Sequence, residues 1–264
     1  MTSKAAHRVR LDQLLVQRSL APSRERAQAL ILAGAVRVNG ERLSRRADSV
    51  DDDATITIDT GPRFVSRGGE KLDAALDELG LDVRGRVALD IGSSTGGFTD
   101  CLLQRGASRV YAVDVGKGQL DWKLRNDARV VVMEGLNARE GFDLPEPVDV
   151  VVADVSFISL RLALPPAFAH LSEGGEVVAL VKPQFEAGRE AVGRGGIVRD
   201  PVARAGSVIA VAARFAEEGV PVIAVVPSRI PGREGNREIF VHARRGGIAL
   251  DASALRDAAE RAAQ

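Results

Sequence analysis

Residues 87–100 read VALDIGSSTGGFTD, and this stretch decides the class of fold. A short apolar run over 87–89 leads into Asp90, a turn rich in glycine and serine follows, and a helical pattern starts at Phe98. A strand, a tight turn and a helix N-terminus in this order form a corner typical of nucleotide-binding proteins. Gly92 permits a positive φ or a close backbone approach to a ligand. The spacing departs from G-x-G-x-x-G, so an ordinary Ser/Gly turn is the alternative interpretation.

The composition is that of an ordinary globular protein. The chain has 264 residues, of which 45% are hydrophobic and 27% charged, which is enough to bury a core. No stretch approaches the roughly 20 apolar residues of a membrane-spanning helix, and the basic N-terminus lacks the apolar run of a secretory signal. The single cysteine, Cys101, excludes an intramolecular disulfide and fits a cytoplasmic location. The histidines and the cysteine show no metal-ligand spacing, so we expect no metal.

The charge of the chain is distributed unevenly. The net charge is zero, but residues 1–46 carry ten Lys and Arg side chains against three acids. Residues 47–264 must therefore carry a net negative charge of the same size. Such an asymmetry indicates that the N-terminal part binds a polyanion.

The N-terminal segment reads as two short helices and a small sheet. Leu11, Leu14 and Leu15 form one apolar helical face, and Ser23 can cap a second helix. Asn39-Gly40 is a strong signal for a two-residue hairpin turn, and residues 54–58 read as a further strand. We therefore predict a small α+β domain over residues 1–59.

The pattern RLDQLLVQ…SRERAQALILAGAVRVNG over about residues 8–58 resembles the S4 domain, a family of small RNA-binding modules. The resemblance implies that a basic face contacts RNA phosphates. A solvated helix face is the alternative. The candidate RNA-binding residues, including one beside the domain joint, are Arg8, Arg10, Arg24, Arg26, Arg37 and Arg67.

After a linker over residues 60–66, residues 67–264 alternate between helical and strand patterns. The last two strands are joined by a loop without a helical pattern, so they should pair as a hairpin with the final strand antiparallel. A mostly parallel, seven-stranded α/β sheet with an antiparallel last strand matches the architecture of Rossmann-like class I methyltransferases. The expected strands are 86–91, 109–113, 129–133, 148–153, 176–182, 220–226 and 238–243.

A nucleoside at the corner would need an acid at the end of the second strand to bind its ribose hydroxyls. Asp114 follows Asp90 by 24 residues and occupies that position. NAD and S-adenosylmethionine both use such an acid, and capping of the next turn is an equal alternative for Asp114 alone. Asn137 lies where an adenine contact would be expected. The candidate cofactor-binding residues are Asp90, Gly92, Ser93, Ser94, Gly96, Gly97, Phe98, Asp114 and Asn137.

Four charged residues stand at strand ends or beside the domain joint: Lys71, Asp154, Lys182 and Glu238. Open α/β sheets carry reacting groups at such positions, although each alone could be a solvated charge. As a set they resemble the Lys-Asp-Lys-Glu tetrad of the RrmJ/FtsJ-type ribose 2′-O-methyltransferases. The strings SRGGEKL, LDIGSSTGGFTD, DVSFISL and KPQFEAG resemble more narrowly the TlyA family of rRNA cytidine-2′-O-methyltransferases, whose members are also called haemolysins.

This resemblance implies methyl transfer from S-adenosylmethionine to a cytidine 2′-hydroxyl of ribosomal RNA within ribosomal subunits. Lys182 is the candidate to contact the hydroxyl and, when its amine is neutral, to act as the base, although the sequence leaves open which of the four residues is the base. Asp154 would orient Lys182 and lie near the sulfonium, and Lys71 and Glu238 would complete the charge network and position the ribose. We expect a cytoplasmic monomer without a metal. The alternatives are an NAD-dependent oxidoreductase, a membrane-damaging cytolysin and a non-catalytic rRNA-binding assembly factor.

Overall fold

The computed structural model describes residues 8–43, 48–59, 61–232 and 234–264. Lys4, Arg45 and Arg46 of the basic segment, and residue 60 of the predicted linker, lie outside these ranges. Contacts within the chain define two compact units, Met1–Arg63 and Phe64–Gln264.

The first unit combines two helices with short antiparallel strands. The helices are α1 (Leu11–Gln17) and α2 (Arg24–Leu32). One ladder joins β1 (Arg8–Arg10) to β4 (Ser49–Asp51). In the other, β2 (Val36–Val38) lies between β3 (Glu41–Arg42) and β5 (Ile56–Ile58).

Local sequence signals explain these elements. The Ser23 hydroxyl accepts a hydrogen bond of 3.2 Å from the Arg26 N–H and caps α2, as predicted. Asn39 and Gly40 both have positive φ, at 51° and 86°, which a type I′ hairpin turn between β2 and β3 requires. Apolar side chains of both helices and of β2 form the core of this unit, namely Leu11, Leu14, Leu15, Ala27, Ile31, Val36 and Val38.

The second unit is built on a seven-stranded sheet. The strand order is β11-β12-β10-β9-β6-β7-β8, and β12 pairs antiparallel with both of its neighbours while the other pairs are parallel. The predicted mostly parallel sheet with an antiparallel last strand is therefore confirmed. The strands are β6 (Val87–Ile91), β7 (Arg109–Asp114), β8 (Val130–Glu134), β9 (Val148–Ala153), β10 (Leu171–Val181), β11 (Val222–Pro227) and β12 (Ile239–Arg244).

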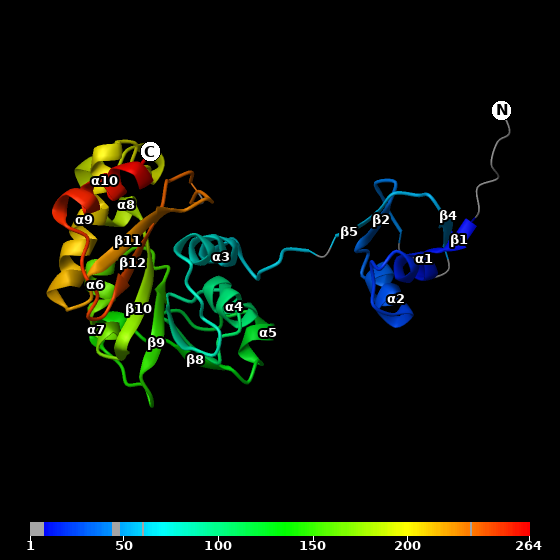
Figure 1. Ribbon diagram of the computed structural model, residues 1–264, viewed down its shortest axis with the longest axis horizontal. Coiled ribbons are helices and arrows are strands. Elements are labelled where there is room, and N and C mark those ends of the chain that lie inside the picture. The colour runs from blue at the N-terminus through cyan, green and yellow to red at the C-terminus, as the bar shows by residue number, and fades with distance from the viewer. Residues whose placement is uncertain (1–7, 44–47, 60, 233) are drawn as a thin grey trace. The chain divides into compact units, whose positions relative to one another are not determined.

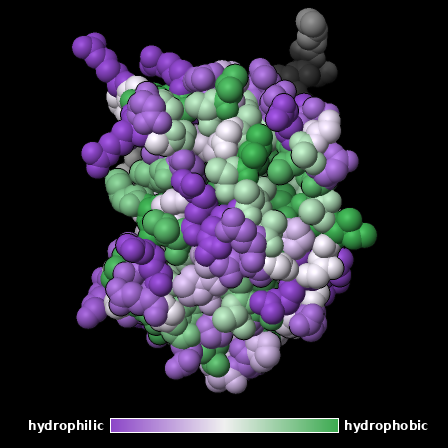
Figure 2. All heavy atoms as spheres, turned by 90° about the vertical axis from the view of Figure 1, so that its left-hand side faces the viewer, coloured by the Kyte–Doolittle hydropathy of each residue, from purple (hydrophilic) through white to green (hydrophobic). Residues whose placement is uncertain are grey.

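Helices cover both faces of this sheet (Figure 1). Successive strand residues point to opposite faces, so Leu89 joins one buried cluster and Ala88 the other. One face is covered by α3 (Arg67–Leu79), α4 (Gly97–Gln104) and α5 (Trp122–Arg125). The other is covered by α6 (Leu160–Ala163), α7 (Pro165–Phe168), α9 (Pro201–Glu217) and α10 (Ala252–Ala262). On the side of the molecule that carries α9 and α10, apolar and hydrophilic side chains are intermixed (Figure 2).

The second unit begins within the predicted linker. Phe64 is buried and packs in the core beneath α3 and α4. Val65 is partly buried against the same core, and its N–H donates to Asp100. Residues 64 and 65 are therefore part of the second unit rather than of a linker. None of the helices within the described ranges is long and apolar enough to cross a membrane.

Candidate active site

The corner between β6 and α4 requires glycine at two positions. Gly92 has φ +82°, and a Cβ atom there would lie 2.9 Å from the backbone oxygen of Asp154. Gly96 has φ +95°, and a Cβ there would lie 2.2 Å from the Leu124 side chain. Other residues are strained at such φ values and would force the neighbours apart. The expected positive φ at Gly92 is confirmed, and it lets the turn approach the end of β9 closely.

Asp90 lies in β6 beneath this corner and is fully buried. Its Oδ2 accepts a hydrogen bond of 2.7 Å from the Thr99 hydroxyl of α4, whereas Oδ1 has no hydrogen-bond partner among the described residues. Burial raises the pKa of this carboxyl to about 7, and the charges of Asp154 and Asp114 act in the same direction, against the Thr99 hydrogen bond. A positive charge bound nearby would relieve this crowding of carboxylates.

The raised pKa makes a prediction for the stability of the ligand-free protein. An unfolded aspartate has a pKa of about 3.9, so between that pH and about 7 the folded protein binds the additional proton at Asp90. The stability contributed by this site should therefore be present at low pH and be lost as pH rises toward 7. Relative to Asp90→Asn, the free energy of unfolding should fall by at most about 4 kcal/mol between pH 4 and pH 8. Urea unfolding of both proteins across this range measures the difference. A difference in the free energy of unfolding that does not change with pH would contradict the raised pKa of Asp90.

Two cavities adjoin the corner and share part of their lining, including Gly92, Asp154 and Phe157. The smaller cavity, of about 520 Å³, lies at the ends of β6, β7 and β9. Most of its remaining lining is apolar, from Ile91, Val113, Val115, Leu136, Ala138, Val155, Ile158 and Ala163. The larger cavity, of about 690 Å³, extends from the corner to the start of α3, the end of β10 and the segment before β12.

Asp114 ends β7 at the wall of the smaller cavity. Its Oδ2 accepts a hydrogen bond of 2.8 Å from the Ser94 N–H, and its Oδ1 accepts one of 2.7 Å from the Gly116 N–H. The capping role considered for Asp114 is therefore present, and the same side chain also lines the cavity. Asn137 lines this cavity too, while its side chain caps the short 3₁₀ turn Ala138–Glu140.

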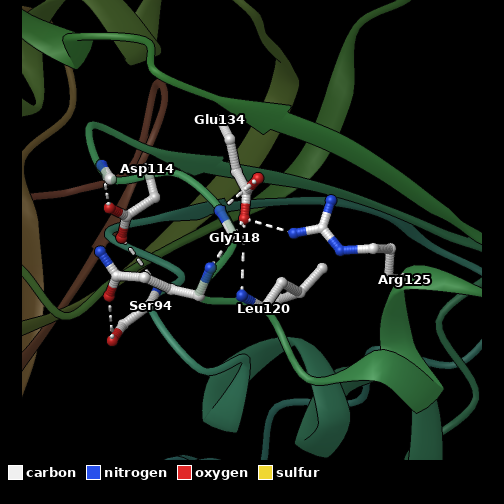
Figure 3. Close-up of polar contacts among 8 residues, drawn as sticks. Ser94, Asp114, Gly118, Leu120, Arg125 and Glu134 are labelled. Carbon is white, nitrogen blue, oxygen red and sulfur yellow. Dashed lines mark hydrogen bonds and ion pairs between the residues drawn. The ribbon is translucent and has the colours of Figure 1, made fainter.

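Glu134 organises the loop that follows Asp114. From the end of β8 its carboxylate accepts hydrogen bonds from the N–H groups of Gly118 and Gln119, at 2.9 and 3.2 Å, and from Arg125 at 2.6 Å. In Figure 3 the Glu134 carboxylate points toward this loop, and the Asp114 carboxylate points toward Ser94 of the Gly-rich corner. The sequence does not reveal this role of Glu134, because only the pairing of β7 with β8 brings it beside the loop.

The four charged residues expected to carry catalysis all line the larger cavity. They form two ion pairs. Lys182 Nζ lies 2.6 Å from Asp154 Oδ1 and donates to the Ser156 hydroxyl at 2.9 Å. Lys71 Nζ lies 2.5 Å from Glu238 Oε2, and both of these side chains are buried. The structure thus brings the whole set to one cavity, with one pair partly open to it and the other largely withdrawn from solvent.

Phe157 is exposed to an unusual degree between the two cavities. The residue is 92% exposed, has φ +65°, and lines both cavities. Its ring lies 5.4 Å from that of Phe185, centroid to centroid. A bulky residue at positive φ is strained, and such strain is concentrated at functional sites. The sequence does not single out Phe157, because nothing in the DVSFISL string separates an exposed ring from a core one.

Glu186 connects the segment after β9 to the segment after β10. It is buried at the end of α8 (Pro183–Glu186) and accepts hydrogen bonds from the Leu160 N–H at 2.6 Å and the Ser159 hydroxyl at 2.5 Å. Burial raises the pKa of this carboxyl, although these hydrogen bonds oppose the shift. The two segments that it joins carry Asp154 and Lys182.

Replacement of Glu186 by glutamine should therefore slow turnover without removing any group that lines the cavity. The neutral amide cannot accept both hydrogen bonds as a carboxylate does, so we expect a loss of about 1–3 kcal/mol in stability. We also expect a turnover number reduced about tenfold, because small displacements of reacting groups are costly. The exposed Glu190→Gln variant is the matched control, measured in the same unfolding and turnover assays. Equal stability and equal turnover numbers for the two variants would show that the hydrogen bonds of Glu186 to Ser159 and Leu160 do not contribute to either.

The remaining site predictions have the following positions. Ser94 lines both cavities, and Ser93, Gly97 and Phe98 line the larger one, as does the exposed Arg67 at the start of α3. Asp90 and Gly96 line neither and shape the corner from within. No group of His, Cys, Asp and Glu residues suited to a metal ion is found in the described part of the chain.

The arginines predicted to bind RNA in the first unit are at least partly exposed. Arg8 donates to the backbone oxygen of Ser49, and Arg37 lies 3.8 Å from Asp59. Arg26 is exposed on α2. Arg10 and Arg24, which begin the two halves of the sequence motif, both donate to one buried carboxylate, that of Asp12.

Comparisons with known proteins agree with this architecture. The FtsJ-like methyltransferase family model matches residues 64–245, and the S4 domain model matches residues 9–56. A Mycobacterium tuberculosis protein named 16S/23S rRNA (cytidine-2′-O)-methyltransferase TlyA is 49% identical, over 97% of this chain and 98% of its own length. Hemolysin A of Brachyspira hyodysenteriae is 43% identical, over 89% of this chain and 99% of its own.

Among solved structures, a hemolysin-named protein from Streptococcus thermophilus superposes with a TM-score of 0.71 at 41% identity, covering 98% of this chain and 96% of its own. The family matches and the full-length relatives together span both units of the chain. This chain therefore belongs to the FtsJ-like methyltransferase family and, within it, to the TlyA family, with an S4 domain preceding the methyltransferase domain.

Proposed function

We propose that this protein transfers the methyl group of S-adenosylmethionine to the 2′-hydroxyl of a cytidine in ribosomal RNA. One observation carries the proposal: Lys71, Asp154, Lys182 and Glu238 line a single cavity that shares its wall with a second cavity at the Gly-rich corner. The activity named for the mycobacterial relative supports the choice of substrate.

The smaller cavity fits the proposed methyl donor in size and charge. Its volume of about 520 Å³ lies within the range of about 300–1,000 Å³ common for small-molecule sites. Its charged lining residues are Asp114, Asp154 and Arg139, and Asp90 is buried beneath them. Carboxylates favour a sulfonium cation, whereas they would repel the pyrophosphate of a nicotinamide dinucleotide. This excess of carboxylates favours a methyltransferase over the oxidoreductase alternative.

We assign the donor to this cavity through the predicted residues. Gly92 and Ser94 would approach it through the backbone, Asp114 would accept from its ribose hydroxyls, and Asn137 would contact its adenine. Ser93, Gly96, Gly97 and Phe98 would hold the turn, with Asp90 beneath it. When bound, S-adenosylmethionine supplies an electrophilic methyl group, so the protein's task is alignment and removal of one proton.

The larger cavity would hold the acceptor ribose. Lys182, in its neutral amine form, would contact the 2′-oxygen and accept its proton, because its nitrogen stands at the wall of the cavity and its partner Asp154 lines both cavities. Asp154 would hold the nitrogen in place by accepting a hydrogen bond from it, and would form an ion pair with it once the proton has been taken up. Lys71 and Glu238 would position the ribose through their own pair at the same cavity. The exposed Phe157 ring offers an apolar surface to the RNA beside this cavity.

We further propose that residues 1–59 bind ribosomal RNA and that residues 67–264 carry the reaction. Arg8, Arg10, Arg24, Arg26 and Arg37 would contact phosphates from the first domain, and Arg67 would do so beside the active site. The substrate would be RNA assembled in ribosomal subunits, which implies a cytoplasmic location. The four side chains proposed for catalysis line one cavity within a single chain, which supports our proposal that the protein acts as a monomer. We also propose that the reaction needs no metal.

Incubation of purified small and large ribosomal subunits with radiolabelled S-adenosylmethionine tests the proposal. We expect label in ribosomal RNA at a discrete cytidine, mapped as a 2′-O-methyl group by resistance to alkaline cleavage. Binding of the subunits without incorporation would favour the assembly-factor alternative. Binding of NAD without affinity for S-adenosylmethionine would favour an oxidoreductase, and lysis of red cells by lipid-free protein would favour the cytolysin.

A further inference from the structure

Among the described residues of the first unit, Asp12 has the densest set of polar contacts. The side chain is fully buried in the first turn of α1. Its Oδ1 accepts from Arg10 Nε at 3.0 Å. Its Oδ2 accepts from Arg10 Nη2 and Arg24 Nη2, each at 3.1 Å, and from Gln28 Nε2 at 2.9 Å. One carboxylate therefore joins the end of β1 to the start of α2.

The two arginines held by Asp12 keep most of their hydrogen-bonding capacity. Their side chains are 43% and 51% exposed for Arg10 and Arg24, respectively, although the carboxylate between them is not exposed at all. A guanidinium has about five N–H donors. Toward the described residues Arg10 uses two and Arg24 one. Both side chains therefore remain accessible to a ligand, and the cluster of two guanidinium groups and one carboxylate keeps a net positive charge.

The contacts of Asp12 are not needed for helix capping. Ser23 already caps α2. A buried ion pair is weak support for stability, because removal of the charges from water offsets their attraction. It does fix geometry, and the hydrogen bonds from Arg10 hold the pKa of Asp12 well below its usual range, so the carboxylate stays charged. A long arginine side chain loses about 2 kcal/mol of rotamer freedom when it is immobilised, and here that loss occurs during folding rather than during RNA binding.

We propose that Asp12 is a positioning residue that holds Arg10 and Arg24 as a preformed, two-armed clamp for phosphates of the RNA backbone. The inference rests on the proposed function, since it takes ribosomal RNA as the ligand of this domain. Asp12 itself does not touch the RNA and acts through the two guanidinium groups.

Geometry and net charge make opposite predictions for Asp12→Asn. This substitution keeps the size of the side chain and removes one negative charge from a surface that attracts a polyanion. If only charge matters, RNA binding should tighten. If the clamp matters, binding should weaken, because an asparagine amide accepts fewer hydrogen bonds from the guanidinium groups and its own N–H₂ repels them. The exposed Asp53→Asn variant changes the charge of the same unit equally and provides the matched control.

The experiment uses the full-length protein and purified ribosomal subunits over a series of salt concentrations. For Asp12→Asn we expect subunits to bind about tenfold more weakly, with a salt dependence reduced by about one unit of slope for each phosphate that the two arginines no longer neutralise. The KM for subunits should rise while the turnover number at saturation stays unchanged. Asp53→Asn should bind as tightly as the parent protein or more tightly. Binding by Asp12→Asn that equals or exceeds that of Asp53→Asn overturns the inference.

A double variant that lacks both arginines distinguishes a positioning role of Asp12 from a role in the folding of the unit. In the Arg10→Gln/Arg24→Gln protein, Asp12→Asn should cause no further loss of subunit binding, because its partners are already gone. A further loss would show that Asp12 acts by stabilising the whole unit, and it would overturn the clamp. If Arg10→Gln/Arg24→Gln binds subunits normally, the assignment of these arginines to RNA binding fails instead. Failure of the clamp and failure of the RNA-binding assignment therefore give different results.

Discussion

Lys182→Ala should bind S-adenosylmethionine with nearly normal affinity and transfer methyl groups about 10²–10⁴-fold more slowly, the range expected for loss of a group that moves a proton. Lys182 directly follows β10 at the wall of the larger cavity, and its amine is held by Asp154 at 2.6 Å and by Ser156 at 2.9 Å. Removal of the amine leaves the smaller cavity intact, because Lys182 does not line it. Calorimetric titration of the donor and single-turnover methylation of ribosomal subunits measure the two quantities separately.

Lys182→Arg separates proton transfer from charge. Arginine keeps the positive charge and can still pair with Asp154, but it does not give up its proton in proteins. If Lys182 accepts the proton of the 2′-hydroxyl, the arginine variant should be nearly as slow as the alanine variant. A methylation rate close to that of the parent protein would show that positive charge suffices. An unchanged rate for Lys182→Ala would remove Lys182 from the mechanism altogether.

The second large effect concerns stability and involves the buried pair of Lys71 and Glu238. Their side chains are 9% and 3% exposed, and Nζ and Oε2 lie 2.5 Å apart. Lys71→Met leaves the Glu238 carboxylate buried without its partner, which should lower the free energy of unfolding by about 3–5 kcal/mol. Replacement of both residues, as Lys71→Met with Glu238→Gln, removes both charges and should recover most of that loss. Urea unfolding of the two single variants and the double variant measures these energies.

Methylation activity should not recover with stability. Because both side chains line the larger cavity, the double variant should be stable yet slow with ribosomal subunits. The exposed pair of Arg229 and Glu78, 3.1 Å apart with Arg229 66% exposed, is the control. Glu78→Gln should change stability by about 1 kcal/mol or less, because solvent screens such a pair. Similar losses for Lys71→Met and Glu78→Gln would show that burial of the first pair has no energetic consequence.

The sequence was sufficient wherever a pattern is local. The Gly92 turn follows from a strand, a glycine and a helix start within a few residues, and Ser23 and Asn39-Gly40 act on their immediate neighbours. The charged residues at strand ends were predictable as a group, because parallel strands bring their carboxyl ends to one edge of a sheet. The hairpin at the end of the sheet followed from a loop without a helical pattern. The position of β12 between β10 and β11 was not predictable from the sequence. β12 forms an antiparallel ladder along both of its edges, and the order of strands along the chain does not specify its second neighbour.

Other parts of the site depend on interactions between distant segments. Glu134 lies beside the loop after Asp114 only because β8 pairs with β7. Glu186 reaches Leu160 across 26 residues, and Asp12 reaches Gln28 across 16. The pairing of Lys71 with Glu238 and of Lys182 with Asp154 also depends on the tertiary structure. The same holds for the exposure of Phe157.

By itself the amino-acid sequence determined the kinds of element, the alternation that buries two faces of a sheet, and the residue types that gather at one edge of it. These properties depend on the backbone freedom of glycine, on helix capping and on hydrophobic periodicity, all of which act over a few residues. Only the tertiary structure decided which acid partners which cation and which carboxylates are withdrawn from water. Ion pairing and desolvation depend on distance and burial in space, and the spacing of residues along a chain does not specify either of them.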